Sequence, residues 1–314
     1  MAIAQPLLFI GGASRSGSTI LGRVLGEVPG CVHVGEMHQL WRSVIPDNWP
    51  CECDALFHDC PFWQQVMDRA FGGIDKVDCA AVREDSHAVK RHWGYGRLMR
   101  VLDMPRYRPP LARYAGTLRE LVEALREESG CQIVVDSSKT APQAAALQAA
   151  GYQVHALHLV RHPAAVAYSN LRRRSIRTAN GEETTMRRLT VDESVLRWNK
   201  DNMAMLNVGP SLTTCRLLRY EDFAMAPAKA LSSLHEQWPW LESPGELLDE
   251  ESRIHFGIAH AARGNPVLGR KGAVQINLDE EWREQLTPSD QESILKGTGP
   301  VRKALDSRFG PTNW

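Results

Sequence analysis

The stretch GGASRSGSTILGRVL, residues 11–25, decides the fold. It follows the short apolar run PLLFIGG (6–12), which predicts a β-strand that ends in glycine. After the glycines, apolar residues recur at helical spacing. A strand, a glycine loop and a helix in this order are typical of a phosphate-binding loop. Backbone N–H groups of such a loop and the positive end of the helix dipole together bind anions.

The loop departs from the ATP-binding pattern G-x-x-x-x-G-K-[ST] at one position. Gly12 and Gly17 have the glycine spacing and Thr19 supplies the hydroxyl, but Ser18 stands at the lysine position. In ATP-binding proteins this lysine reaches the β- and γ-phosphates. The loop's cation is instead Arg15. We therefore expect a shorter anion, with one phosphate in the loop and Arg15 stabilising charge on the leaving oxygen.

The rest of the chain predicts a parallel sheet covered by helices, because strand candidates alternate with helical patterns and several strands are apolar on both faces. The strand candidates are 6–12, 32–36, 131–138, 152–160 and 215–222, and the helical patterns include 19–28, 112–128, 142–150 and 190–206. No internal repeat or low-complexity tract interrupts them. We expect one α/β domain over residues 1–314, with a largely helical insertion at about 40–115 on the acceptor side.

Composition excludes several classes of protein. The formal net charge is +0, so the protein is no general polyanion binder, and we expect no nucleic-acid partner despite the basic, aromatic segment 87–113. No stretch approaches the ~20 apolar residues of a membrane span, and the start lacks a basic signal region. The seven cysteines are odd in number and mostly scattered, which favours a reducing compartment. We predict a cytoplasmic protein, with its oligomeric state left open.

Polar residues follow most of the predicted strands. In an open parallel sheet, ligands bind at the carboxyl ends of the strands. Ionisable groups stand at four such ends: Glu36, Lys139, Arg161 and the run Tyr220-Glu221-Asp222. A solvated loop end explains any one of them, but the parallel sheet would bring all of them to the edge that carries the glycine loop.

A second anion site is indicated after the fourth strand. Arg161 ends that strand, and Ser169 follows eight positions later, about two turns into the next helix. A further basic group, Arg270-Lys271-Gly272, lies in a glycine-rich loop near the carboxyl end of the chain. The alternative is structural: Arg161 pairs with a neighbouring carboxylate and Ser169 is a small packing residue.

Together these residues resemble the sulfotransferases that use 3′-phosphoadenosine 5′-phosphosulfate (PAPS). The resemblance rests on SRSGST (14–19) after the first strand and on the Arg161–Ser169 pair after the fourth. It implies that the 5′-phosphosulfate is bound by Ser14, Arg15, Ser16, Gly17, Ser18 and Thr19, and the 3′-phosphate by Arg161 and Ser169. Arg270-Lys271-Gly272 is similar to the 3′-phosphate loop of the cytosolic members. Since PAPS has no β- or γ-phosphate, the missing lysine is expected.

The resemblance also implies the chemistry. PAPS would be the co-substrate, released as adenosine 3′,5′-bisphosphate, and no metal is expected because the SO₃-like transition state carries less charge than a phosphoryl group. Glu36 would be the general base, as in the tyrosylprotein and related bacterial enzymes, with His38 the alternative by similarity to the phenol-type enzymes. Arg15, where the family more often has lysine, is similar to the tyrosylprotein and carbohydrate branches.

Lys139 has two interpretations. It either lies over the transferring sulfuryl group as a catalytic residue or neutralises Asp136. The acceptor is left open among small molecules, glycans, lipids and peptides. The alternative function is a P-loop phosphotransferase (kinase) or a non-catalytic nucleotide-binding module, which magnesium dependence would distinguish from a sulfotransferase.

The segment PCECDALFHDCPFW (50–63) raises a separate question of metal binding. Cys51, Cys53, Cys60 and His58 are four possible zinc ligands, although the C-x-C start is tighter than common zinc spacings. A local disulfide and free thiols are the other two interpretations.

Overall fold

A five-stranded parallel sheet forms the centre of the computed structural model. The structure describes residues 5–90, 104–172, 175–177, 183–185, 187–251, 253–262, 271–312 and 314. The strand order is β2-β3-β1-β4-β7. The strands are β1 (Pro6–Gly11), β2 (Cys31–His33), β3 (Ile133–Lys139), β4 (Gln153–Val160) and β7 (Thr214–Arg219). The predicted α/β fold with a parallel sheet is confirmed.

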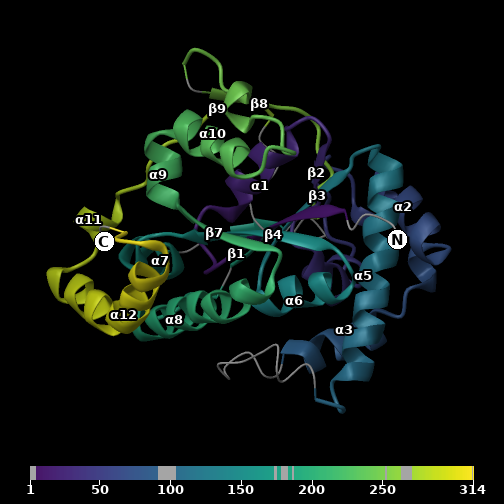
Figure 1. The fold of residues 1–314 in the computed structure, drawn as a ribbon, viewed down its shortest axis with the longest axis horizontal. Helices are drawn as coiled ribbons and strands as arrows, with labels where there is room; N and C mark the ends of the chain where they lie inside the picture. The colour runs from purple at the N-terminus through teal and green to yellow at the C-terminus, as the bar shows by residue number, and fades with distance from the viewer. Residues whose placement is uncertain are drawn as a thin grey trace.

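Helices cover both faces of the sheet (Figure 1). One face carries α1 (Ser18–Gly26), α9 (Tyr220–Met225) and α10 (Pro227–Gln237), and the other carries α5 (Arg108–Ser129), α6 (Ala141–Ala149) and α8 (Val191–Val208). Next to this second group of helices lie α7 (Pro163–Leu171), α11 (Trp282–Gln285) and α12 (Pro288–Phe309). Two antiparallel pairs lie outside the sheet: β5 (Ser175–Arg177) with β6 (Glu183–Thr185), and β8 (Arg253–Phe256) with β9 (Gly272–Gln275).

The alternation of side chains along β1 explains the two layers of helices. Leu7 and Phe9 belong to the core under α5, α6 and α8, whereas Leu8 and Ile10 belong to the core under α1, α9 and α10. All four are buried. Because successive side chains of a strand point to opposite faces, an uninterrupted apolar run needs a cover on both sides.

The described part of the segment between β2 and β3 (residues 34–90 and 104–132) is mostly helical, as expected. Its elements are η1 (Met37–Gln39), η2 (Leu40–Val44), η3 (Phe57–Asp59), α2 (Pro61–Phe71), η4 (Ile74–Lys76), α3 (Cys79–Lys90) and α5. Both α2 and α3 pack on α5, which in turn packs on α6. The segment thus extends the fold beyond the β2 edge of the sheet (Figure 1).

In the part of the chain that the structure describes, no helix is both long and apolar enough to cross a membrane. This agrees with the absence of a predicted span. The cytoplasmic location and the single domain stay predictions.

The glycine loop leaves β1 through a narrow space between its neighbours. Gly12 has φ of 128°, and a Cβ atom there would collide with the carbonyl oxygen of Leu159 in β4. Gly17 has φ of 89°, and a Cβ atom there would lie 2.5 Å from the ring of Tyr220. Both positions require glycine, since L side chains rarely adopt this backbone conformation and no room exists for a methyl group. The Gly12 amide donates to the carbonyl of Lys139 (3.1 Å), which joins the loop to β3.

We predict that Gly12→Ala lowers the free energy of unfolding by at least about 1–3 kcal/mol, the cost of a strained backbone before the collision with β4 is added. Gly116→Ala is the matched control. Gly116 lies within α5, and a Cβ atom there meets nothing within 4 Å. The control should be stabilised by about 0.5–1 kcal/mol. Urea unfolding of both variants checks the prediction, and equal effects would contradict it.

Candidate active site

A cavity of about 500 Å³ lies at the carboxyl ends of the strands. The predicted site residues that line it are Ser14, Arg15, Gly17, Ser18, Thr19, Glu36, Lys139, Arg161 and Ser169. They come from the glycine loop, from the ends of β2, β3 and β4, and from α7. A larger cavity of about 980 Å³ lies beside α3, but none of these residues lines it. The convergence of charged groups therefore selects the smaller cavity.

The glycine loop leads into a helix N-terminus that has no side-chain cap. Helix α1 begins at Ser18, and its N-cap residue Gly17 has no side chain to cap it. Ser16 is buried, does not line the cavity, and its hydroxyl has no hydrogen-bond partner among the described residues. Uncapped amides at a helix N-terminus are electropositive and bind anions. These features are compatible with the predicted binding of a phosphate-like group.

Arg161, which follows β4, is held in place at the cavity by several contacts. Its guanidinium donates to the Arg15 carbonyl (3.2 Å) and to the Asp279 carbonyl (3.2 Å), and it pairs with the Asp279 carboxylate (3.2 Å). It also lies over the ring of Tyr220, with Cζ 4.4 Å from the centroid. The expected ion pair with a neighbouring carboxylate thus exists, and the same side chain still lines the cavity. Ser169 is buried and lines it from α7.

Of the basic group at 270–272, neither Lys271 nor Gly272 lines this cavity. Arg270 lies outside the described residues. Lys271 is half exposed and pairs with Asp54 (3.1 Å), while Gly272 pairs with Phe256 in the β8–β9 ribbon. Residues 274–277, a few positions later, line the cavity instead. The described part of this loop therefore lines the cavity with residues of β9 and just after it, and not with Lys271.

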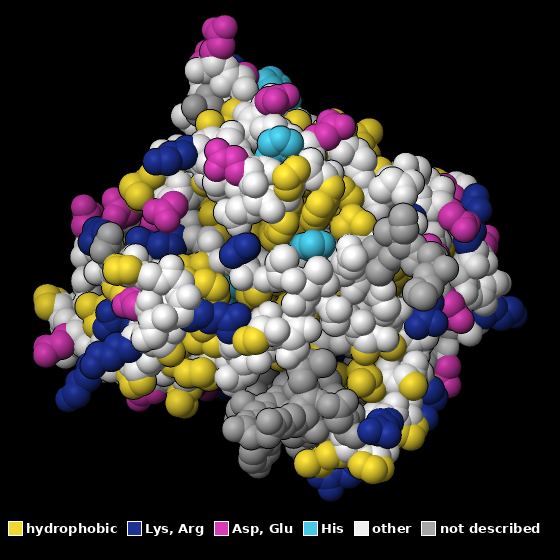
Figure 2. Space-filling model, in the orientation of Figure 1, with side chains coloured by type: hydrophobic (Ala, Val, Ile, Leu, Met, Phe, Trp, Pro, Cys, Tyr) yellow, Lys and Arg dark blue, Asp and Glu magenta, His cyan; other side chains and the backbone are white. Residues whose placement is uncertain are grey.

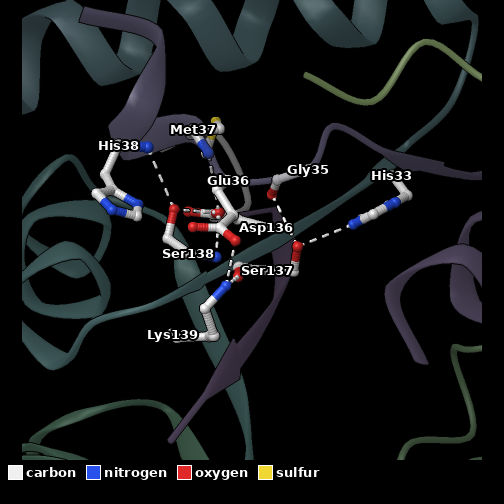
Figure 3. Close-up of polar contacts among 9 residues, drawn as sticks. All are labelled: His33, Gly35, Glu36, Met37, His38, Asp136, Ser137, Ser138 and Lys139. Carbon is white, nitrogen blue, oxygen red and sulfur yellow. Dashed lines mark hydrogen bonds and ion pairs between the residues drawn. The ribbon is translucent and has the colours of Figure 1, made fainter. Parts of the chain in front are cut away.

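Glu36 and Lys139 form an ion pair at the cavity (Figure 3). Glu36 follows β2 at the start of η1, and Lys139 ends β3 with φ of 68°. The Lys139 ammonium also lies 3.4 Å from the Ser137 carbonyl. Both side chains line the cavity and are mostly shielded from solvent. Of the interpretations given for Lys139, neutralisation of Asp136 is wrong, because the ammonium pairs with Glu36 instead.

Asp136 instead holds the loop that carries Glu36 (Figure 3). Its Oδ1 accepts from the amide of Ser138 (2.8 Å), from the Ser138 hydroxyl (2.5 Å) and from the amide of Met37 (3.4 Å). The Ser138 hydroxyl in turn accepts from the amide of His38 (3.2 Å). Burial raises the pKa of the Asp136 carboxyl to about 6 from its ordinary 3.8. These bonds fix the backbone on the carboxyl side of Glu36.

His38 turns away from the cavity. Its side chain is 8% exposed and is not among the residues that line the site. Burial, helped by the positive charges of Lys90 and Lys139, holds its pKa well below the ordinary 6.5. Between the two candidate bases, Glu36 is the one that faces the cavity.

Several lining residues were not predicted as site residues. Arg187 pairs with Glu193 (2.5 Å), and Arg197 lies 3.8 Å from Asp201 on the next turn of α8. Asp279, the partner of Arg161, lines the cavity after β9. The i, i+4 spacing of Arg197 and Asp201 was visible in the sequence, but it equally fits a surface ion pair. Figure 2 shows Lys and Arg side chains over the region of α7 and α11, interspersed with acidic ones.

Comparison with known proteins adds to this geometry. The profile of the sulfotransferase family matches residues 6–240. Two solved structures share the fold over 94% of this chain: the sulfotransferase domain of the olefin synthase from Synechococcus PCC 7002 (18% identity, TM-score 0.51, 95% of that chain) and the sulfotransferase domain from the curacin biosynthetic pathway (17% identity, TM-score 0.51, 98% of that chain). No curated protein matches the sequence.

We predict that Asp136→Asn gains stability relative to the parent protein as pH rises. An acid whose pKa is raised by folding costs stability above its unfolded pKa, so the parent loses stability as pH rises from about 4 to 7. The amide does not ionise and escapes this loss. The difference in unfolding free energy between the two proteins should shift by about 2–3 kcal/mol in favour of the variant between pH 4 and 7. Urea unfolding at both pH values measures it, and a constant difference would contradict the buried carboxylate.

Proposed function

The chain belongs to the sulfotransferase family, and we propose that it transfers a sulfuryl group from PAPS to a hydroxyl or amine of an acceptor. The observation that carries the proposal is one cavity bordered by an uncapped glycine loop without the ATP-type lysine, by Arg161 with Ser169, and by Glu36. The loop and the Arg161 side are two separate anion sites. A carboxylate that lines the same cavity fits the removal of a proton from an acceptor.

The residues present fit the two charged ends of PAPS. We assign the 5′-phosphosulfate to the glycine loop, where the buried Ser16 hydroxyl has no partner among the described groups and the α1 amides are uncapped. We assign the 3′-phosphate to Arg161 and Ser169, since the buried Arg161 Nε also has no hydrogen-bond partner among the described residues. Asp279 would give up part of its ion pair to the phosphate. Arg187 and Arg197 add positive charge to the same cavity, in place of Lys271.

The proposed step is an in-line displacement at sulfur. The acceptor oxygen or nitrogen forms a bond to sulfur while the bond from sulfur to the 5′-phosphate oxygen breaks. Glu36 takes the acceptor proton, and adenosine 3′,5′-bisphosphate leaves with the electron pair. Arg15 stabilises the charge that develops on the leaving phosphate.

We assign Lys139 two roles in this step, one toward Glu36 and one toward the transferring group. Its ammonium holds the Glu36 carboxylate before the acceptor enters, and it lines the same cavity as the glycine loop. A positive group beside the transferring sulfuryl group lowers the barrier only through charge that develops in the transition state, which in this transfer is the charge on the leaving oxygen. No metal is assigned to the transfer.

Small molecules, glycans, lipids and peptides are the acceptor classes covered by the proposal. Labelled PAPS offered with a panel of hydroxyl and amine acceptors tests it directly, without added Mg²⁺. Label on an acceptor together with released adenosine 3′,5′-bisphosphate supports the proposal. Transfer from ATP and Mg²⁺ instead would overturn it in favour of a kinase.

We predict that the protein binds adenosine 3′,5′-bisphosphate much more tightly than AMP, and that Arg161→Ala removes most of the difference. A charge-assisted hydrogen bond contributes roughly 1.5–3 kcal/mol, so the variant should bind the bisphosphate about 10–100-fold more weakly. Arg172→Ala is the matched control. Arg172 ends α7, is half exposed, pairs with Glu281 and does not line the cavity. Titration calorimetry measures both, and equal affinities for bisphosphate and AMP would refute the second phosphate site.

We predict that Glu36→Gln lowers kcat by about 10²–10⁴, the usual worth of general-base catalysis, with affinity for adenosine 3′,5′-bisphosphate almost unchanged. The amide keeps the size and polarity of the side chain but cannot take the proton. His38→Asn is the control and should cost much less, because His38 is buried away from the cavity. If His38→Asn has the larger effect, histidine is the base and the assignment of Glu36 fails.

A further inference from the structure

Three cysteines and one histidine converge on a point outside the proposed active site. Cys51, Cys53 and Cys60 belong to the loop before α2, and His260 follows β8. Their ligand atoms all lie within 4.8 Å of one another. The histidine is not the one expected from the local sequence: His58 instead directs Nε2 to the Ile45 carbonyl (2.9 Å).

Four of the six distances within this cluster are close to those of a tetrahedral metal site. The sulfur of Cys60 lies 3.6 Å from that of Cys53 and 3.7 Å from that of Cys51. His260 Nδ1 lies 3.3 Å from the Cys60 sulfur and 3.8 Å from the Cys51 sulfur. Four-coordinate zinc, at about 2.3 Å from sulfur and about 2.0–2.1 Å from nitrogen, requires sulfurs about 3.8 Å apart and sulfur–nitrogen separations of about 3.5–3.6 Å.

The histidine of the cluster is held in place by its neighbours. The His260 ring stacks on Phe62 (centroids 4.8 Å apart), and the His260 carbonyl accepts a hydrogen bond from the Trp63 indole (2.7 Å). Contacts of this kind orient a metal ligand.

A disulfide accounts for the cluster less well. The sulfurs are far beyond the ~2.05 Å of a disulfide bond, and all seven cysteines are free. A disulfide would also use only two of the three sulfurs and would give the imidazole no role. A tetrahedral ion uses all four groups.

We propose that Cys51, Cys53, Cys60 and His260 bind a structural Zn²⁺ ion. Three thiolates and one imidazole in tetrahedral arrangement are a closed zinc set, with no position for a substrate or water. The ion takes no part in sulfuryl transfer, and the proposal does not depend on that function.

The ion would link the segment 51–60 to the segment around His260, next to the candidate base Glu36. Ala262, two residues after His260, pairs with Gly35, and its amide donates to the Val34 carbonyl (3.0 Å). Cys51 pairs with the same alanine on its other side. Gly35 immediately precedes Glu36, so the zinc site would hold the backbone on the amino side of Glu36 in place.

Metal analysis of the full chain tests the proposal. The chain should purify with about one zinc per molecule after growth in zinc-supplemented medium. Co²⁺ substituted for zinc should give the visible bands of a tetrahedral thiolate site. Cys60→Ser and His260→Ala should weaken binding by more than the about 10–100-fold typical of outer-sphere changes. His58→Ala, the matched control, should keep full zinc content.

Three results would overturn the proposal. These are a metal-free protein whose seven thiols all react and which shows no tetrahedral Co²⁺ spectrum, a disulfide among the three cysteines in mass spectrometry, or equal loss of zinc in His58→Ala and His260→Ala. The cobalt spectrum of the parent chain keeps the test valid if a variant does not fold.

Discussion

The close approach of the glycine loop to its neighbours is the constraint on which the site depends. Gly12 packs against the β4 backbone and bonds to the end of β3, and Gly17 packs under the Tyr220 ring. Because β1 lies at the centre of the sheet, the loop is held from both sides at once. The Arg15 carbonyl then serves as an anchor for Arg161. One set of backbone contacts therefore positions both the loop to which we assign the phosphosulfate and the arginine to which we assign the second phosphate.

The Glu36–Lys139 pair depends on the same sheet in another way. The two residues lie about a hundred positions apart, but β2 and β3 are parallel neighbours, so their carboxyl ends meet. Asp136 and Ser138, on the same strand as Lys139, hold the backbone after Glu36. Burying a carboxylate under this loop costs stability at neutral pH. The hydrogen bonds to Oδ1 offset part of that cost and position Glu36.

The strands, the loop and the cavity residues that directly follow the strands could be predicted from local sequence patterns. Apolar runs ending in glycine or in charged groups locate the strands, and parallel strands bring their ends together. The partner of Lys139 could not be chosen locally, since Asp136 and Glu36 are both acidic groups near a strand end. The prediction that Lys271 binds the 3′-phosphate relied on a short motif. The pairing of β8 with β9 instead decides which described residues of that segment reach the cavity.

The histidine of the proposed zinc site shows most clearly what local patterns leave out. His58 lies between Cys53 and Cys60 in sequence, but the 3₁₀ turn Phe57–Asp59 directs it to a backbone carbonyl. His260 is about two hundred residues from Cys60, and only the pairing of Ala262 with Gly35 and Cys51 brings it to the sulfurs. That pairing needs Gly35, because a Cβ atom there would collide with the Ala262 carbonyl. The same short backbone contact thus determines the fourth ligand of the proposed metal site and the position of the residue before Glu36.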